Sequence, residues 1–186
     1  MTLEQALATP GPLVAAWEGW TSRADRTLLV YSVQSKPSKL AEAAVPEPER
    51  DALSRDLRKR GVRIGTWVPL SDRFWCSDEQ GFALWSLTRL EADGRNGDLQ
   101  LADGRHVSAA QVRTVTSFVE DGMTHRGVRL ELADGSSIVV ADEEDSAPLA
   151  DPTYNRDNLS IDAAWASYLG AALAKWLGKP HVNQVP

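Results

Sequence analysis

Leu99-Gln-Leu-Ala-Asp-Gly-Arg-His-Val107 and Leu130-Glu-Leu-Ala-Asp-Gly-Ser-Ser-Ile138 are two versions of one pattern, and they decide the fold class. In each stretch, apolar and polar residues alternate on both sides of an Asp-Gly pair. Alternation is typical of a half-buried strand, and Asp-Gly supplies the positive φ angles that a two-residue type I′ turn needs. Each stretch therefore predicts a tight β-hairpin, and the two together predict an antiparallel meander.

Further strands are predicted around these hairpins. Residues 26–34, 62–70 and 82–91 are rich in β-branched and aromatic side chains, and residues 112–119 lie between the two hairpins. Short strands that follow one another with turn signals between them are typical of a sandwich or barrel.

The apolar period changes to that of a helix near the C-terminus. Apolar side chains from Ile161 to Leu177 follow helical spacing and form one wide face. Asn158 and Ser160 are candidate N-caps, and Gly178 stands where a helix commonly stops. We predict an amphipathic helix over residues 159–178 that closes the open sheet.

The chain is predicted to consist of an N-terminal α/β extension, residues 1–61, packed on an antiparallel β domain, residues 62–186. The extension is predicted to hold helices over residues 3–8, 13–20 and 47–60, a strand over 26–34, and a proline-punctuated connection over 35–48. The helix over 47–60 has a thin apolar stripe, so we expect it on the surface.

These elements predict an α+β fold, with a partly open antiparallel meander closed by the C-terminal helix. Short strands carrying the Leu-x-Leu-Ala-Asp-Gly pattern and capped by one amphipathic helix resemble the pleckstrin-homology-like fold over residues 81–178. The resemblance implies a docking module. Its lipid-binding members tend to carry basic residues in the first strand loops, whereas this part of the chain is acid-rich, which argues against phosphoinositide binding. No functional residue is carried over, because a fold alone does not set a function.

Composition indicates a globular protein of the cytoplasm. Among 186 residues there is a single cysteine, Cys76, which fits a reducing compartment. No apolar run reaches the length of a membrane helix, so we expect no membrane insertion. The net charge is −6, which argues against nucleic acid as a partner.

Seven tryptophans are spread along the chain, and we interpret them mainly as core residues. Two sharper hypotheses stay open. Trp17 and Trp20 could belong to an aromatic surface, or Trp67, Trp75 or Trp85 could line a pocket for a small ligand or lipid.

Residue types that carry catalysis or bind metals occur without a supporting pattern. Cys76 lies between aromatics with no neighbour that would lower its pKa. The three histidines, His106, His125 and His181, have no second ligand three or four residues away. No catalytic residue, metal site or cofactor is therefore assigned. An enzyme of unrecognised type would be supported if His125, Glu120 and Asp121 converged in one cleft.

Charge is unevenly distributed, and this carries the functional hypothesis. Residues 50–63 hold a basic excess, and residues 118–162 hold an acidic one. The candidate interaction residues are the acidic run and the polar loop that follows it: Asp142, Glu143, Glu144, Asp145, Tyr154, Asn155 and Arg156. Each also has a plain structural interpretation, as a solvated acidic turn and as a capped loop before the helix.

We therefore expect a non-catalytic protein-binding module of the adaptor or immunity type, whose acidic face meets a basic partner. An exposed edge strand of the meander would also let two copies pair into a homodimer.

Overall fold

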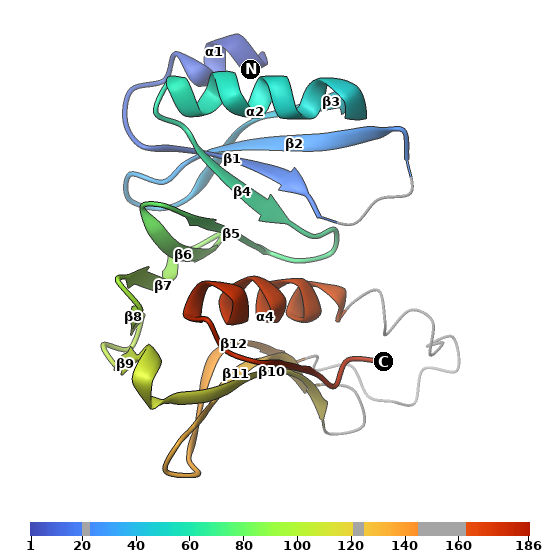
Figure 1. Ribbon diagram of the computed structural model, residues 1–186. Coiled ribbons are helices and arrows are strands. Elements are labelled where there is room, and N and C mark those ends of the chain that lie inside the picture. The colour runs from blue at the N-terminus through green and yellow to red at the C-terminus, as the bar shows by residue number, and fades with distance from the viewer. Residues whose placement is uncertain (20–22, 121–124, 145–162) are drawn as a thin grey trace. The chain divides into compact units, whose positions relative to one another are not determined.

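The computed structural model describes residues 1–19, 23–120, 125–144 and 163–186 (Figure 1). It is a mixed α+β structure, mostly strands in two sheets, with a helix near the C-terminus, and neither sheet closes into a barrel. The chain forms two compact units, Met1–Leu90 and Glu91–Pro186. Within the described residues, no helix has the length and apolar character needed to cross a membrane.

Unit 1 is a mixed sheet with two helices. Its strands lie in the order β3-β2-β1-β4-β5-β6. Strands β1 and β4 are parallel, and every other neighbouring pair in this order is antiparallel. The elements are α1 (Leu3–Leu7), β1 (Leu13–Glu18), β2 (Asp25–Ser32), β3 (Ser38–Pro46), η1 (Glu47–Glu49), α2 (Arg50–Lys59), β4 (Arg63–Trp67), β5 (Arg73–Asp78) and β6 (Gly81–Ser86).

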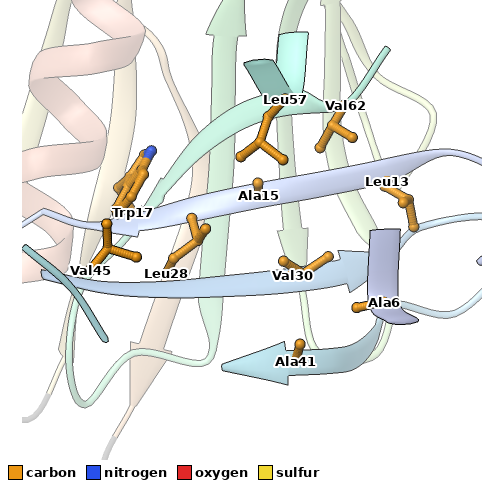
Figure 2. Packing of buried hydrophobic residues seen from close by; sticks show 10 residues of the cluster. All are labelled: Ala6, Leu13, Ala15, Trp17, Leu28, Val30, Ala41, Val45, Leu57 and Val62. Carbon is orange, nitrogen blue, oxygen red and sulfur yellow. The ribbon is translucent and has the colours of Figure 1, made fainter. Parts of the chain in front are cut away.

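The two helices share one hydrophobic core with strands β1 to β4. Figure 2 shows Ala6 of α1 and Leu57 of α2 lying over side chains of β1 and β2 such as Ala15 and Val30. Val14 and Ala16, which stand on either side of Ala15 in β1, belong to a second core on the other face of the sheet.

Strand β1 is buried along its whole length, and this explains one wrong prediction. The stretch from Leu13 to Trp20 was expected to be helical, yet Leu13–Glu18 is a central strand. A strand that is buried on both faces is a continuous apolar run, so it lacks the alternation that distinguishes a strand from a buried helix.

Aromatic rings on the second face of unit 1 show that its sheet folds over on itself. The Tyr31 ring of β2 stacks on the Phe74 ring of β5 with centroids 4.0 Å apart, and Phe74 stacks on Trp85 at 5.3 Å. In a flat sheet, β2 and β5 would be about 14 Å apart, because β1 and β4 lie between them in the ladder.

Unit 2 contains a three-stranded meander, a four-stranded sheet and a long helix. The meander is β7-β8-β9, and the sheet has the order β12-β11-β10-β13, with β10 and β13 parallel. The elements are β7 (Leu90–Arg95), β8 (Asp98–Leu101), β9 (His106–Ser108), η2 (Ala109–Gln111), β10 (Val112–Glu120), β11 (His125–Leu132), β12 (Ser137–Glu144), α4 (Ala164–Leu177) and β13 (His181–Asn183).

The two units share one topology. In each, three antiparallel strands are followed by a helix and by a fourth strand that lies parallel to the first, in the order third, second, first, fourth. A short helical turn with a reciprocal capping box precedes each set, between Thr2 and Gln5 in unit 1 and between Ser108 and Gln111 in unit 2. The internal repeat of this chain is therefore an arrangement of strands.

Both Asp-Gly hairpins are present, but they belong to different sheets and use another turn. Gly104 and Gly135 have positive φ angles of 86° and 87°, whereas Asp103 and Asp134 do not have positive φ. Each loop is thus of the three-residue kind with a left-handed glycine, and the prediction of type I′ turns is wrong. The φ pattern of type I′ occurs instead at Asn96-Gly97, between β7 and β8.

The other predicted elements are partly confirmed. The strand over 26–34 and the helices over 3–8 and 47–60 are present as β2, α1 and α2. The connection over 35–48 is instead mostly strand β3, and the single strand over 82–91 is divided between β6 and β7. The closing helix is described from Ala164 to Leu177, and its predicted start lies outside the described residues.

The division into units also differs from the expected one. The structure places it after Leu90, whereas we expected it after residue 61. The physical reason is that β4, which begins at Arg63, pairs with β1 and so completes the sheet of the N-terminal unit. Four tryptophans are buried core residues, as predicted: Trp17, Trp75, Trp85 and Trp165.

The turn after β4 places a leucine where the backbone favours glycine. Leu70 has a φ of 67° and follows Pro69, and the Ser71 amide donates to the Val68 carbonyl at 3.1 Å. Proline second and a positive φ third are the signature of a type II turn. Because the Leu70 side chain is 69% exposed, little packing offsets the strain.

We therefore predict that Leu70→Gly raises the free energy of unfolding by about 0.5–1 kcal/mol, since relief of the left-handed strain exceeds the extra entropy of glycine in the unfolded chain. Urea denaturation would measure the change. Leu87→Gly, at an exposed leucine without positive φ, should be destabilising, and equal effects of the two substitutions would contradict the explanation.

Candidate functional site

The acidic run of unit 2 lies at the end of β12, and the pleat of the strand divides it between two faces of the sheet. Glu143 is on the α4 side, where its carboxylate accepts a hydrogen bond from Trp165 Nε1 at 3.0 Å and lies 3.5 Å from Arg126 Nε. Asp142, on the opposite face, lies 3.0 Å from His125 Nε2. Glu143 is thus a structural counter-ion of the buried Arg126, whereas Asp142 and Glu144 are exposed.

The remaining candidate interaction residues, Asp145, Tyr154, Asn155 and Arg156, lie outside the described residues.

The face of the sheet opposite α4 carries a network of charged side chains around Phe118. The Arg129 guanidinium donates to Glu120 and, at 2.7 Å, to Glu131, and it lies 5.0 Å above the Phe118 ring. The hydrogen bond that Arg129 donates to Glu120 holds the pKa of Arg129 above its ordinary value. The His125 ring meets Phe118 edge-on at 5.1 Å.

This network bears on the hypothesis of an unrecognised enzyme. Glu120 and His125 are direct partners across β10 and β11, so the strands do bring them together. Their polar atoms are nevertheless engaged elsewhere, with Arg129 and Asp142 respectively. Asp121, the third residue of that hypothesis, lies outside the described residues.

Ser117, which is buried, and His181, which is half-buried, form a hydroxyl–imidazole pair that the sequence did not reveal. Ser117 Oγ on β10 lies 2.9 Å from His181 Nε2 on β13, and it also donates to the Ala166 carbonyl of α4 at 2.7 Å. A hydroxyl has one proton to donate, so with that proton directed to Ala166, the Nε2 of His181 must be the donor to Ser117. A nucleophilic serine needs the opposite polarity, with the imidazole accepting its proton.

The surroundings of the pair support a structural role. Ser117 is fully buried, and a Cβ atom added at Gly170 of α4 would lie 2.1 Å from Ser117 Oγ and 2.8 Å from His181 Nε2. The helix therefore packs directly on the pair, and the pair ties β10, β13 and α4 together. The signal in the sequence was Gly170 itself, because glycine inside a helix often marks a close approach of another chain segment.

Other reactive groups are also occupied by the fold. Burial raises the pKa of the Cys76 thiol to about 12, so it stays protonated. Within the described ranges, no group of three or more His, Cys, Asp or Glu side chains is arranged to hold a metal ion. Trp75 and Trp85 are buried in unit 1, where Trp85 belongs to the aromatic stack.

No protein-family model, curated protein or solved structure matches this chain.

The close packing at Gly170 leads to a prediction. We expect Gly170→Ala to lower the free energy of unfolding by about 1–3 kcal/mol, because overpacking outweighs the better helix propensity of alanine. In the Ser117→Ala background, where the nearest atom is removed, the same substitution should cost less. Urea titration of the four variants measures the coupling, and simple additivity would contradict direct packing of Gly170 on Ser117.

The burial of His181 in its pair with Ser117 also predicts that the stability of the fold depends on pH. Burial lowers the pKa of His181 below its ordinary 6.5, so on acidification the unfolded chain takes up a proton before the folded chain does. The stability that His181 contributes is complete above pH 6.5 and is lost as the pH falls below that value. His181→Gln, which keeps an N–H donor but does not titrate, should flatten the fall in stability between pH 7 and pH 5.

Thermal or urea unfolding across this pH range measures the slope, and His106→Gln, at an exposed histidine, is the matched control. Equal slopes for the two variants would contradict the assignment.

Proposed function

We propose that this protein is a non-catalytic protein-binding module of the cytoplasm, of the adaptor or immunity type, that takes a basic segment of its partner along β12. One observation carries the proposal. In the described part of unit 2, β12 is an edge strand with a neighbour on one side, and it ends in the exposed carboxylates of Asp142 and Glu144.

An edge strand offers backbone donors and acceptors in a row, to which an extended peptide can add as a further strand. Carboxylates beside that edge select a peptide with lysine or arginine side chains and speed its approach. Asp142 is suited to this, since its side chain is 52% exposed. Asp142 contacts His125 on the adjacent strand β11, and within the described residues no strand pairs with the other edge of β12.

A different interpretation is that the same carboxylates protect the edge strand. Charged residues on an edge strand also prevent unwanted pairing with other chains. The two interpretations differ in what they predict for a cationic, extended peptide, which a protective edge would leave unbound.

Two other classes have less support. A ligand or lipid pocket lined by tryptophans would need accessible rings, whereas Trp75 and Trp85 are buried, and Trp67 is half-buried and does not line the pocket next to α2. The enzyme hypothesis needs His125, Glu120 and Asp121 to converge in one cleft, and of these only Glu120 and His125 lie within the described residues, where they are cross-strand neighbours. The resemblance to pleckstrin-homology-like domains contributes only the general expectation that the protein docks onto a partner.

The test uses a fluorescein-labelled peptide of alternating lysine and threonine, with binding followed by fluorescence anisotropy. We expect Asp142→Lys combined with Glu144→Lys to weaken binding at least about tenfold, because attraction becomes repulsion. Hydrogen exchange should show that the peptide protects backbone amides of β12 (Ser137–Glu144).

The matched control combines Glu49→Lys with Asp98→Lys, at two exposed acids on other elements. Failure of the peptide to bind, equal loss in the control, or protection outside β12 would each count against the proposal. Concentration-dependent dimerisation that Asp142→Lys and Glu144→Lys abolish would assign the edge to a second copy of the chain.

A further inference from the structure

Helix α2 of unit 1 presents three cations on its outer side. Ser54 and Leu57 face the core, and Arg55, Arg58 and Lys59 are exposed on the side away from it. Among the described residues these three have no ion pair, in contrast to Arg60, the C-cap residue of the helix, which pairs with Asp56 at 3.0 Å. We call Arg55, Arg58 and Lys59 the α2 cation stripe.

Helix stability explains only part of this stripe. Cations in the last turn interact favourably with the helix dipole, which accounts for Arg58 and Lys59. The effect is confined to the end of the helix, so it does not account for Arg55 one turn earlier. An unpaired guanidinium in a chain of net charge −6 is free to meet an acidic group from outside.

A pocket of about 300 Å³ adjoins the stripe at Arg58. It lies where the end of α2 and the start of β4 face the turn between β5 and β6. Its lining residues are Arg58, Gly61, Val62, Arg63, Ile64, Asp78, Glu79 and Gln80.

The chemistry of the pocket follows from which of its charges are already satisfied. Arg63 donates to both carboxylate oxygens of Asp78 at 2.9 Å and to the Gly81 carbonyl at 2.9 Å, so it is locked in the wall. Val62 and Ile64 supply apolar surface, and Glu79 lies exposed at the turn. Arg58 is the lining cation whose guanidinium remains available to a carboxylate, which it can bind through two parallel hydrogen bonds.

We propose that the α2 cation stripe and its pocket bind an acidic segment of a partner protein, one of whose carboxylates enters the pocket at Arg58. Arg55 and Lys59 then contact acidic side chains that follow along the helix. A protein segment fits better than nucleic acid, because a phosphate backbone needs a longer track of cations than these three residues provide. This site is separate from the β12 edge and does not depend on it.

The test measures the anisotropy of a fluorescein-labelled peptide of alternating glutamate and serine. Reversal of the stripe by Arg55→Glu, Arg58→Glu and Lys59→Glu should weaken binding at least about tenfold, and added salt should weaken binding to the natural chain. The control reverses three exposed cations elsewhere, Lys36→Glu, Arg95→Glu and Arg113→Glu, which changes the net charge equally. Circular dichroism confirms that both variants fold.

Single conservative variants test whether binding needs the guanidinium of Arg58 in the pocket or only the positive charge of the stripe. Arg58→Lys keeps the charge but loses the planar fork, so it should weaken binding severalfold, whereas Arg55→Lys should leave it nearly unchanged. The double variant Asp142→Lys with Glu144→Lys should not weaken binding of the acidic peptide. This result would distinguish the α2 site from the β12 edge.

Three results would overturn the proposal. These are no binding of the acidic peptide, equal loss in the control variant, and tighter binding of a single-stranded oligonucleotide of equal charge, which would assign the stripe to nucleic acid.

Discussion

The structure depends on one constraint, which is that the first strand of the four-strand arrangement shared by the two units, β1 in unit 1 and β10 in unit 2, lies at the inside of its sheet. Strands β1 and β10 each take an antiparallel neighbour on one side and a parallel neighbour on the other. A strand in this position has its backbone groups paired on both edges. In β1 all six residues are also buried, and in β10 the four residues from Val115 to Phe118 are buried. In β10 the same position holds Ser117, which the fold accommodates by satisfying its hydroxyl twice.

Local signals in the sequence were sufficient for many of the elements. Strand β2 combines β-branched and aromatic residues, and Gly61 and Gly178 follow the ends of α2 and α4 with positive φ, as expected after a helix. What could not be predicted depends on partners distant in the chain. The parallel pairing of β10 with β13 rests on three residues of β13 that carry no strand pattern of their own.

The candidate site shows the same limit. The acidic run was visible in the sequence, but its division between two faces appears only once residues 142–144 are known to be in a strand. Ser117 and His181 are paired through tertiary structure alone, at a separation of 64 residues. The basic excess over residues 50–63 was equally visible, whereas the locking of Arg63 by Asp78, which leaves Arg58 available, needed the fold.

The shared topology makes the difference between the two helices informative. Helix α4 is covered on two sides, because Gly170 packs on Ser117 while Trp176 lies where a Cβ atom of Gly94 in β7 would be. Helix α2 occupies the equivalent place in unit 1, yet its Arg55 and Lys59 are exposed. Helix α4 exposes one cation, Lys175, beside Tyr168 and Ala171, whereas the exposed side of α2 carries three cations. The difference between the two helices is the charge of the exposed side, and this is why we assign binding of an acidic partner to the α2 cation stripe rather than to α4.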